Sequence, residues 1–123
     1  MAKIVINKTF GGFDLSEAGQ ARLFQLGSDH VKELPPEMRT EWHRAGDYLF
    51  RSWDIPRHDP LLIQVVEELG ETANGATAEL EIVEIVGNLY RVREEDGREF
   101  VETPDLAHWI DASAANTSVI WSF

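Results

Sequence analysis

The sequence predicts an α+β fold in a single domain covering residues 1–123: an antiparallel β-meander packed on one main helix, preceded by a strand, a loop and a helix. Three observations predict it. The chain opens with a β-branched run and a capped helical segment, an amphipathic segment begins at Asp59, and three short strand-like runs lie within residues 77–103. A chain of this length holds one hydrophobic core and is too short for two.

The N-terminal strand, loop and helix are predicted from local signals. The apolar, β-branched run of residues 3–7 is typical of a strand, and the Gly11–Gly12 pair permits the turn that follows. Ser16 is suited to cap a helix over residues 17–26, and Gly27 is a suitable stop.

The main helix is predicted to begin at Asp59 and to run to about Ala73. The Asp59 carboxylate can accept hydrogen bonds from the first free amides, and Pro60 presets the backbone angle of the first turn. Apolar residues then recur on one face, with glutamates and a glutamine opposite. The apolar residues are Leu61, Leu62, Val65, Val66 and Leu69. Upstream, residues 48–53 form either a short strand or an irregular connection.

The meander is predicted from alternation and turn residues. Strict alternation over residues 77–82 indicates a strand, and the adjacent apolar Ile82 and Val83 indicate either a β-bulge or a strand covered on both faces. Gly87-Asn88 then predicts a hairpin turn into the second strand. Asp96-Gly97 is a type I′ turn signal, so it predicts a second hairpin leading into the third strand.

The sequence also predicts two short helices and a C-terminal tail. Met38, Trp42 and Ala45 recur at helical spacing, and Thr103-Pro104 can begin a last helix. The tail over residues 111–123 ends in an apolar run. Because such an ending is seldom left in water, we expect it to cover a groove on its own domain or to contribute to contacts in a homo-oligomer.

The distribution of charged residues along the chain limits which classes of binding partner we expect. The net charge is −11, and all of the excess lies after Arg57, where the chain has three Arg, no Lys and fourteen Asp or Glu. Direct nucleic-acid binding through a basic surface is therefore not expected. The acidic half serves either solubility alone or attraction to a basic groove on a partner protein.

Membrane insertion and secretion are not expected either. The apolar runs are only a few residues long, and a charge interrupts the N-terminal run at Lys3 and again at Lys8. We therefore expect no membrane partner and a location in the cytoplasm of the host cell.

The residues that usually carry chemistry do not form a catalytic pattern. The four histidines are scattered without metal-ligand spacing, there is no cysteine, and no serine lies in a nucleophile elbow. The glutamate clusters fall on faces predicted to be solvated, where their pKa values would stay close together. We therefore expect no metal, no cofactor and no enzymatic activity.

A ligand-binding site is the remaining candidate. Aromatic faces can stack on a base, arginines can clamp a phosphate, and small residues allow close backbone approach. The candidates are Phe10, Gly11, Gly12, Phe13, Arg57, Asn74, Arg91 and Arg93. Each has a structural alternative: the glycines can serve a turn, the aromatics can pack in the core, and Arg91 and Arg93 can pair across strands with Glu79, Glu81 or Glu99. If Arg57 binds an anion, Arg57→Ala should weaken binding with little loss of fold.

Two stretches carry a resemblance to a known family. They are KIVINKTFGGFDLS at residues 3–16, and DIPRHDPLLIQVVEELG at residues 54–70 continuing through ANG (73–75) and AELEIVEI (78–85). Together they resemble a family of small phage and prophage proteins related to the first type of Thoeris anti-defence protein. Members end in a segment similar to EKHRTW, whereas residues 102–109 here keep Trp109 but lack the arginine.

The resemblance implies a function. It implies a phage-encoded, non-enzymatic, oligomeric sponge that sequesters a cyclic ADP-ribose type immune signal made by a host enzyme, and the missing arginine implies a lost or altered ligand. The acidic second half indicates the alternative, an inhibitor of the anti-CRISPR or DNA-mimic type that binds a host defence protein.

Overall fold

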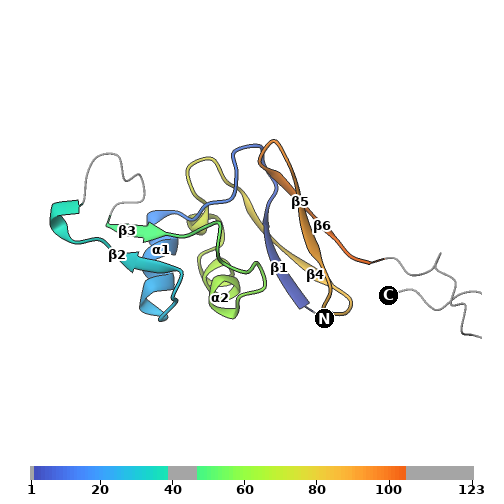
Figure 1. Cartoon of the computed structure of the whole chain (residues 1–123), viewed down its shortest axis with the longest axis horizontal. Coiled ribbons are helices and arrows are strands. Elements are labelled where there is room, and N and C mark those ends of the chain that lie inside the picture. Colours follow the sequence, from blue (N-terminus) through green and yellow to red (C-terminus); the bar gives the residue numbers. More distant parts are fainter. Residues whose placement is uncertain (1, 39–46, 105–123) are drawn as a thin grey trace, which may run out of the picture.

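The structure is a computed structural model that describes residues 2–38 and 47–104. It confirms a mixed α+β fold in one small domain (Figure 1). The strands are β1 (Ala2–Asn7), β2 (Val31–Glu33), β3 (Tyr48–Phe50), β4 (Leu80–Ile85), β5 (Arg91–Glu95) and β6 (Arg98–Glu102). The helices are α1 (Glu17–Gln25) and α2 (Pro60–Leu69), with 3-10 turns at Pro36–Met38 and Gly70–Ala73. The predicted helix through Trp42 and Ala45, the last helix and the tail over 111–123 lie outside the described residues.

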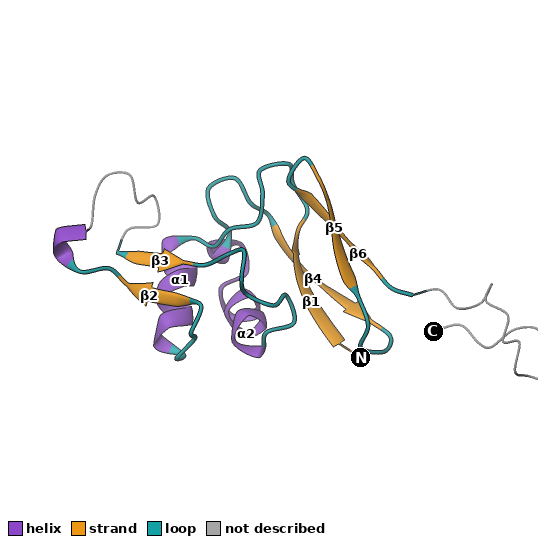
Figure 2. Cartoon of the chain, in the orientation of Figure 1, coloured by secondary structure: helices purple, strands orange, loops and turns teal. Residues whose placement is uncertain are grey.

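The elements are arranged in layers. The short β2–β3 ladder packs on α1, and α2 lies between α1 and the β1–β4 ladder (Figure 2). The β5–β6 hairpin covers the other face of that ladder. The β1–β4 ladder is therefore the central layer of the domain.

Both helices begin where their caps predict. The Ser16 hydroxyl accepts a hydrogen bond from the Gly19 N–H at 3.1 Å, and the Asp59 carboxylate accepts from the first amides of α2 at 2.9 and 3.0 Å. After α1, Gly27 has a φ of 88°, a conformation that glycine adopts without strain. The α-helix is shorter than the predicted helix to about Ala73: α2 ends at Leu69, where Gly70 takes a positive φ of 55°, and a separate 3-10 turn then runs to Ala73.

The central ladder explains the break in alternation at Ile82 and Val83. β1 and β4 pair antiparallel along all six residues of each strand, so β4 contains no bulge. Ile82 packs toward the helices with Val5, whereas Val83 packs toward the hairpin with Ile4. Of the two interpretations, the strand covered on both faces is confirmed.

Strand pairing differs from the predicted three-strand meander. The Asp96-Gly97 hairpin forms, but β4 pairs with β1, and β5 pairs with β6 only. The N-terminal strand is as long as β4 and rich in β-branched residues, so it offers β4 a full-length partner. The connection over residues 86–90 then carries the hairpin across the ladder, where Val92 and Val101 cover Ile4.

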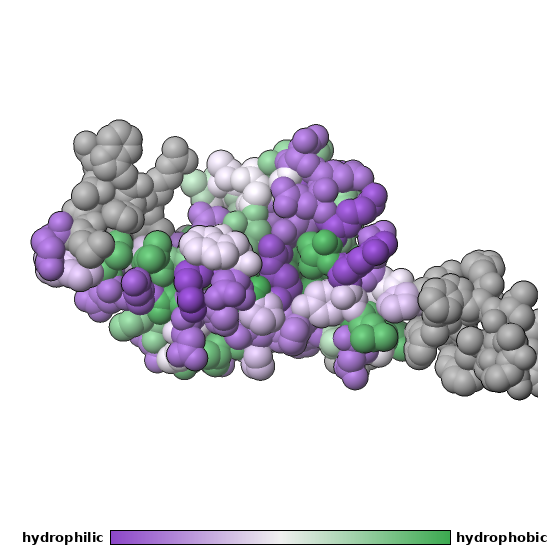
Figure 3. Space-filling view, viewed as in Figure 1, coloured by the Kyte–Doolittle hydropathy of each residue, from purple (hydrophilic) through white to green (hydrophobic). Residues whose placement is uncertain are grey.

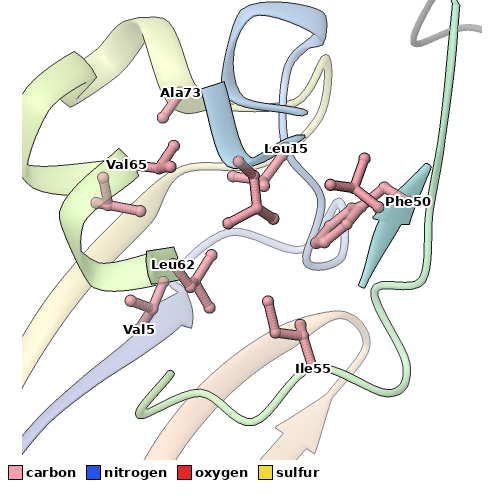
Figure 4. Close-up of a cluster of buried hydrophobic side chains, with 10 residues drawn as sticks. Val5, Leu15, Phe50, Ile55, Leu62, Val65 and Ala73 are labelled. Atoms are coloured by element: carbon pink, nitrogen blue, oxygen red, sulfur yellow. The ribbon is translucent and has the colours of Figure 1, made fainter. Parts of the chain in front are cut away.

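The main core lies on the helix side of the ladder. Its side chains converge from β1, α1, β3, α2 and the loops between them (Figure 4). The members are Val5, Leu15, Leu23, Val31, Phe50, Ile55, Leu62, Val65, Val66 and Ala73. Burial of these apolar side chains is the main contribution that holds the helices on the ladder.

No helix among residues 2–38 and 47–104 is long and apolar enough to span a membrane.

Candidate functional site

Arg57, the predicted anion ligand, is engaged inside the protein. Its guanidinium donates two hydrogen bonds to the Glu99 carboxylate, at 2.5 and 2.7 Å, and stacks 3.6 Å from the centre of the Phe13 ring. The side chain of Arg57 is 16% exposed and that of Glu99 5%. The structure therefore brings Arg57 and Phe13 together, but a carboxylate of this chain occupies the position expected for a phosphate.

Arg57 also closes an edge of the central ladder. The Val5 N–H donates to the Arg57 carbonyl oxygen at 2.9 Å, and the guanidinium returns a longer hydrogen bond to the Val5 carbonyl at 3.3 Å. Arg57 therefore links the segment before α2 to β1 and, through Glu99, to β6. These contacts assign it a structural task in the single chain.

Asn7 is a buried polar residue that the sequence reasoning did not select. Its Nδ2 donates to the carbonyls of Thr9 and Gly97 at 2.8 and 2.9 Å, and its Oδ1 accepts from the Glu79 N–H at 2.8 Å. Its own N–H donates to Glu99 at 2.8 Å. One fully buried amide thus joins β1, the start of β4 and the hairpin.

The glycine loop that follows β1 is held in place from two sides. The Thr77 hydroxyl donates to the Gly11 carbonyl at 2.9 Å, and a Cβ at Gly11 would overlap Thr77 itself. Gly12 has a φ of 89° and lies beside Gly97 of the hairpin turn. On this fixed backbone the Phe10 side chain points outward and is 67% exposed. The sequence anticipated the turn, but the close approach at Gly11 is to Thr77 of the same chain and not to a ligand.

Asn74 supports the opposite end of the same loop. Its Oδ1 accepts from the Leu80 N–H at 2.9 Å, and it forms a bridge with Leu15. Phe13 contacts Phe50, with ring centres 6.2 Å apart, so it belongs to the core periphery. Among the loop candidates, Phe10 therefore presents the largest exposed aromatic surface.

Arg91 and Arg93 lie on the other face of the hairpin from Arg57. Inward-facing residues of β5 and β6 pack on the ladder, so the alternate residues face solvent. Arg91 donates to Glu102, its cross-strand neighbour, at 2.9 Å, and Arg93 donates to Glu95 at 2.9 Å. The two arginines share one surface, but the structure does not bring them together with Arg57. Their partners also differ from the glutamates that the sequence suggested.

Most described basic side chains have an acidic neighbour. The pairs are Lys3–Glu67, Lys8–Glu79, Arg22–Glu68, Arg51–Asp54, Arg57–Glu99, Arg91–Glu102 and Arg93–Glu95. In one of these, hydrogen bonds from Arg22 and then Gln64 lower the pKa of Glu68 to about 2.

Several carboxylates have no such partner. Within the described part of the chain, the acids outside any ion pair include Glu17, Glu71, Glu81, Glu84 and Glu94. Hydrophilic side chains also predominate around the tip of the hairpin in the view of Figure 3. The excess negative charge is therefore presented on the surface and not consumed by internal pairing.

Two cavities formed by described residues lie away from the predicted site residues. One, of about 260 Å³, opens on the outer face of the β2–β3 ladder and is lined by His30, Lys32 and Arg51 among others. A smaller one, of about 60 Å³, lies between Leu89 and Pro104. In the described ranges, no group of histidine, aspartate and glutamate side chains is arranged to hold a metal ion.

No protein-family model, curated protein or solved structure matches this chain.

Proposed function

We propose that this protein is a phage counter-defence protein that binds and sequesters a cyclic nucleotide signal of the cyclic ADP-ribose type without turning it over. The observation that carries the proposal is the exposed Phe10 ring on a loop whose backbone is fixed by Thr77 and Gly97. A purine can stack on such a ring, and a preformed loop loses little conformational entropy when the ligand binds. The resemblance of residues 3–16 and 54–70 to the phage family supplies the ligand class.

Cations for the phosphates are available on the neighbouring hairpin. Gly97, which abuts the glycine loop, immediately precedes Arg98, and both Arg98 and Arg93 lie 5.0 Å from the centre of the Phe100 ring. Arg91 is 80% exposed despite its contact with Glu102, so a phosphate can compete for it. Arg57 supports this site from inside by holding Phe13 and the hairpin.

The site is open in a single chain. The Phe10 ring faces solvent, and neither of the two cavities is lined by it. Tight capture of a nucleotide requires a pocket that removes most of the ligand surface from water. We therefore propose that a second copy of the chain closes the site, in a homo-oligomer.

Capture followed by heat release tests this function. Purified protein is mixed with cyclic ADP-ribose isomers, separated from free ligand and heated, and the released nucleotide is identified by mass. We expect unaltered ligand and, for Phe10→Ala, affinity weaker by about tenfold, since stacking contributes about 1–3 kcal/mol per base. Trp53→Ala is the matched control, because Trp53 is another exposed aromatic, 77% accessible, outside the loop. Absence of capture, or a chemically changed ligand, would refute the proposal.

A second candidate function is an acidic inhibitor that occupies a basic nucleic-acid groove of a host effector such as a CRISPR complex. The net charge of −11 and the unpaired carboxylates favour it. Exposed charges are screened over a Debye length of about 8 Å at physiological salt. Affinity for such an effector should therefore fall steeply as salt rises, whereas a stacked and enclosed nucleotide should be far less sensitive.

A further inference from the structure

β4 has one paired edge and one open edge, and the register identifies which residues face each. In an antiparallel ladder, the N–H and C=O groups of alternate residues point to the same neighbour. The Lys8 N–H donates to the Glu79 carbonyl at 2.9 Å, so odd-numbered residues of β4 point to β1. The backbone groups of Leu80, Ile82 and Glu84 therefore point away from β1.

The open edge is unpaired over Ile82 and Glu84. The Leu80 N–H is satisfied by Asn74 Oδ1, but within residues 2–38 and 47–104 no hydrogen bond joins the outward groups of Ile82 or Glu84 to another residue. The outer edge of β1 differs, because the outward N–H groups of Val5 and Asn7 donate to Arg57 and Glu99. Among the described residues, the outer edge of β1 is thus bonded at Val5 and Asn7, whereas the outer edge of β4 is open at Ile82 and Glu84.

Side chains beside the open edge are acidic. Glu81 and Glu84 are exposed, lie on opposite faces of β4 and belong to no ion pair among the described residues. Between them Ile82 and Val83 are only partly buried. An added strand would therefore meet apolar contacts at its centre and a carboxylate on each face, which a Lys or Arg can neutralise.

We propose that the outer edge of β4 receives an extended, Lys- or Arg-bearing segment of a partner protein as an added β-strand. Main-chain hydrogen bonds to Ile82 and Glu84 would provide the affinity, and the two glutamates would select a basic segment over a neutral or acidic one. The inference goes beyond nucleotide capture and does not depend on it, since β4 and the Phe10 ring use different residues.

Charge favours a basic partner over a second copy at this edge. Another β4 carries the same two glutamates on a chain of net charge −11, so self-pairing brings four carboxylates together, and Lys3, the cross-strand neighbour of Glu84, already forms an ion pair with Glu67. A two-fold axis through Glu84 would even place like charges opposite each other, which destabilises a strand pair. The same feature protects an open edge against aggregation.

Peptide binding with hydrogen exchange tests the proposal on the full chain. The probe is a capped peptide of about nine residues with a central Val-Val pair and Lys residues on both faces to either side of it, long enough to cover a strand such as β4. A matched peptide replaces each Lys by Glu. We expect binding of the Lys peptide at least about tenfold tighter, a difference of about 1.4 kcal/mol. We also expect new protection of the Ile82 and Glu84 amides, while the Val83 amide, already paired with β1, changes little.

Two variants separate the contribution of the backbone hydrogen bonds from the contribution of the carboxylates to peptide binding. Glu84→Pro removes an outward N–H of β4 without breaking a hydrogen bond to β1. Glu81→Lys with Glu84→Lys reverses the charge beside the edge. Each variant should lower the affinity for the Lys peptide about tenfold. Glu71→Lys with Glu94→Lys, an equal charge change away from β4, should alter affinity less than about twofold.

Three outcomes would overturn the proposal: equal binding of both peptides, binding without protection at Ile82 and Glu84, or protection of those amides by self-association of the free protein. Salt-sensitive binding to an effector that leaves these amides unprotected would support the acidic inhibitor and reject this edge. Nucleotide capture would be unaffected by any of these results.

Discussion

Removing the carboxylate of Glu99 should destabilise the fold strongly. In Glu99→Ala, the Arg57 side chain, which is 16% exposed in the native protein, keeps its charge without a partner, and the Asn7 N–H loses its acceptor. Breaking a buried ion pair from one side costs about 3–5 kcal/mol, because the remaining charge stays desolvated. We therefore expect the free energy of unfolding to fall by about 3–5 kcal/mol. Glu99→Gln keeps an acceptor for Asn7 and loses only the charge, so it should cost less.

Replacing Arg57 tests the same ion pair by removing its cation. The initial expectation was that Arg57→Ala leaves the fold intact, but its contacts with Glu99 and Phe13 now predict destabilisation of similar size. The double variant Arg57→Met with Glu99→Leu should recover part of the loss, because neither charge is then buried alone.

Chemical denaturation followed by circular dichroism provides the measurement, and Arg91→Ala provides the control. Arg91 forms an ion pair with Glu102 through a single hydrogen bond and is 80% exposed, so its removal should cost less than about 1 kcal/mol. If Glu99→Ala and Arg91→Ala lower stability equally, or if the double variant is as unstable as both single losses added, the pair does not act as described.

Three further changes have defined outcomes. Gly97→Ala should lower the free energy of unfolding by about 1–3 kcal/mol, because the φ of 88° at Gly97 disfavours a side chain and the added Cβ would overlap the Phe10 carbonyl. Thermal unfolding measures this, and an unchanged melting temperature would contradict the close approach of Gly97 to Phe10. Ser16→Ala should cost about 1 kcal/mol through loss of the α1 cap, whereas Ser16→Thr keeps a hydroxyl that can accept from Gly19 and donate to Thr72, so it should retain most of the stability; equal losses in both would contradict this role. Glu68→Gln should be less stable than the wild type near neutral pH. The Glu68 pKa is lower in the folded protein than in the unfolded chain, so the ionised carboxylate stabilises the fold at any pH above the unfolded pKa. That difference should disappear as the pH falls from about 4.5 to about 2, and a constant difference across that range would contradict it.

Local signals predicted most of the elements. Caps at Ser16 and Asp59 and the turn at Asp96-Gly97 act over a few residues, so a single sequence is enough to recognise them. The strand β2 was missed because it has only three residues, of which Val31 alone is buried, and no periodicity develops over that length. Its conformation depends on packing against α1.

Pairing between distant segments was not predictable. The turn signal at Gly87-Asn88 favoured a local hairpin, and nothing in either strand shows that β1 competes for β4. The ion pair of Arg57 was not predictable for the same reason: Glu99 lies 42 residues from Arg57, so the sequence could not show that the arginine is neutralised internally. Alternation with Val101 does place Glu99 inward, and a buried glutamate requires a cation, so this signal was present in the hairpin.

Asn7 has a consequence for how the polypeptide is made. It leaves the ribosome before its partner Glu99, which is 92 residues further along, and the whole of β4 must also be synthesised before β1 can pair. During synthesis the nascent β1 strand therefore carries three consecutive aliphatic residues without a ladder to join. Folding of this domain must follow synthesis of the hairpin, which favours slow formation of long-range contacts.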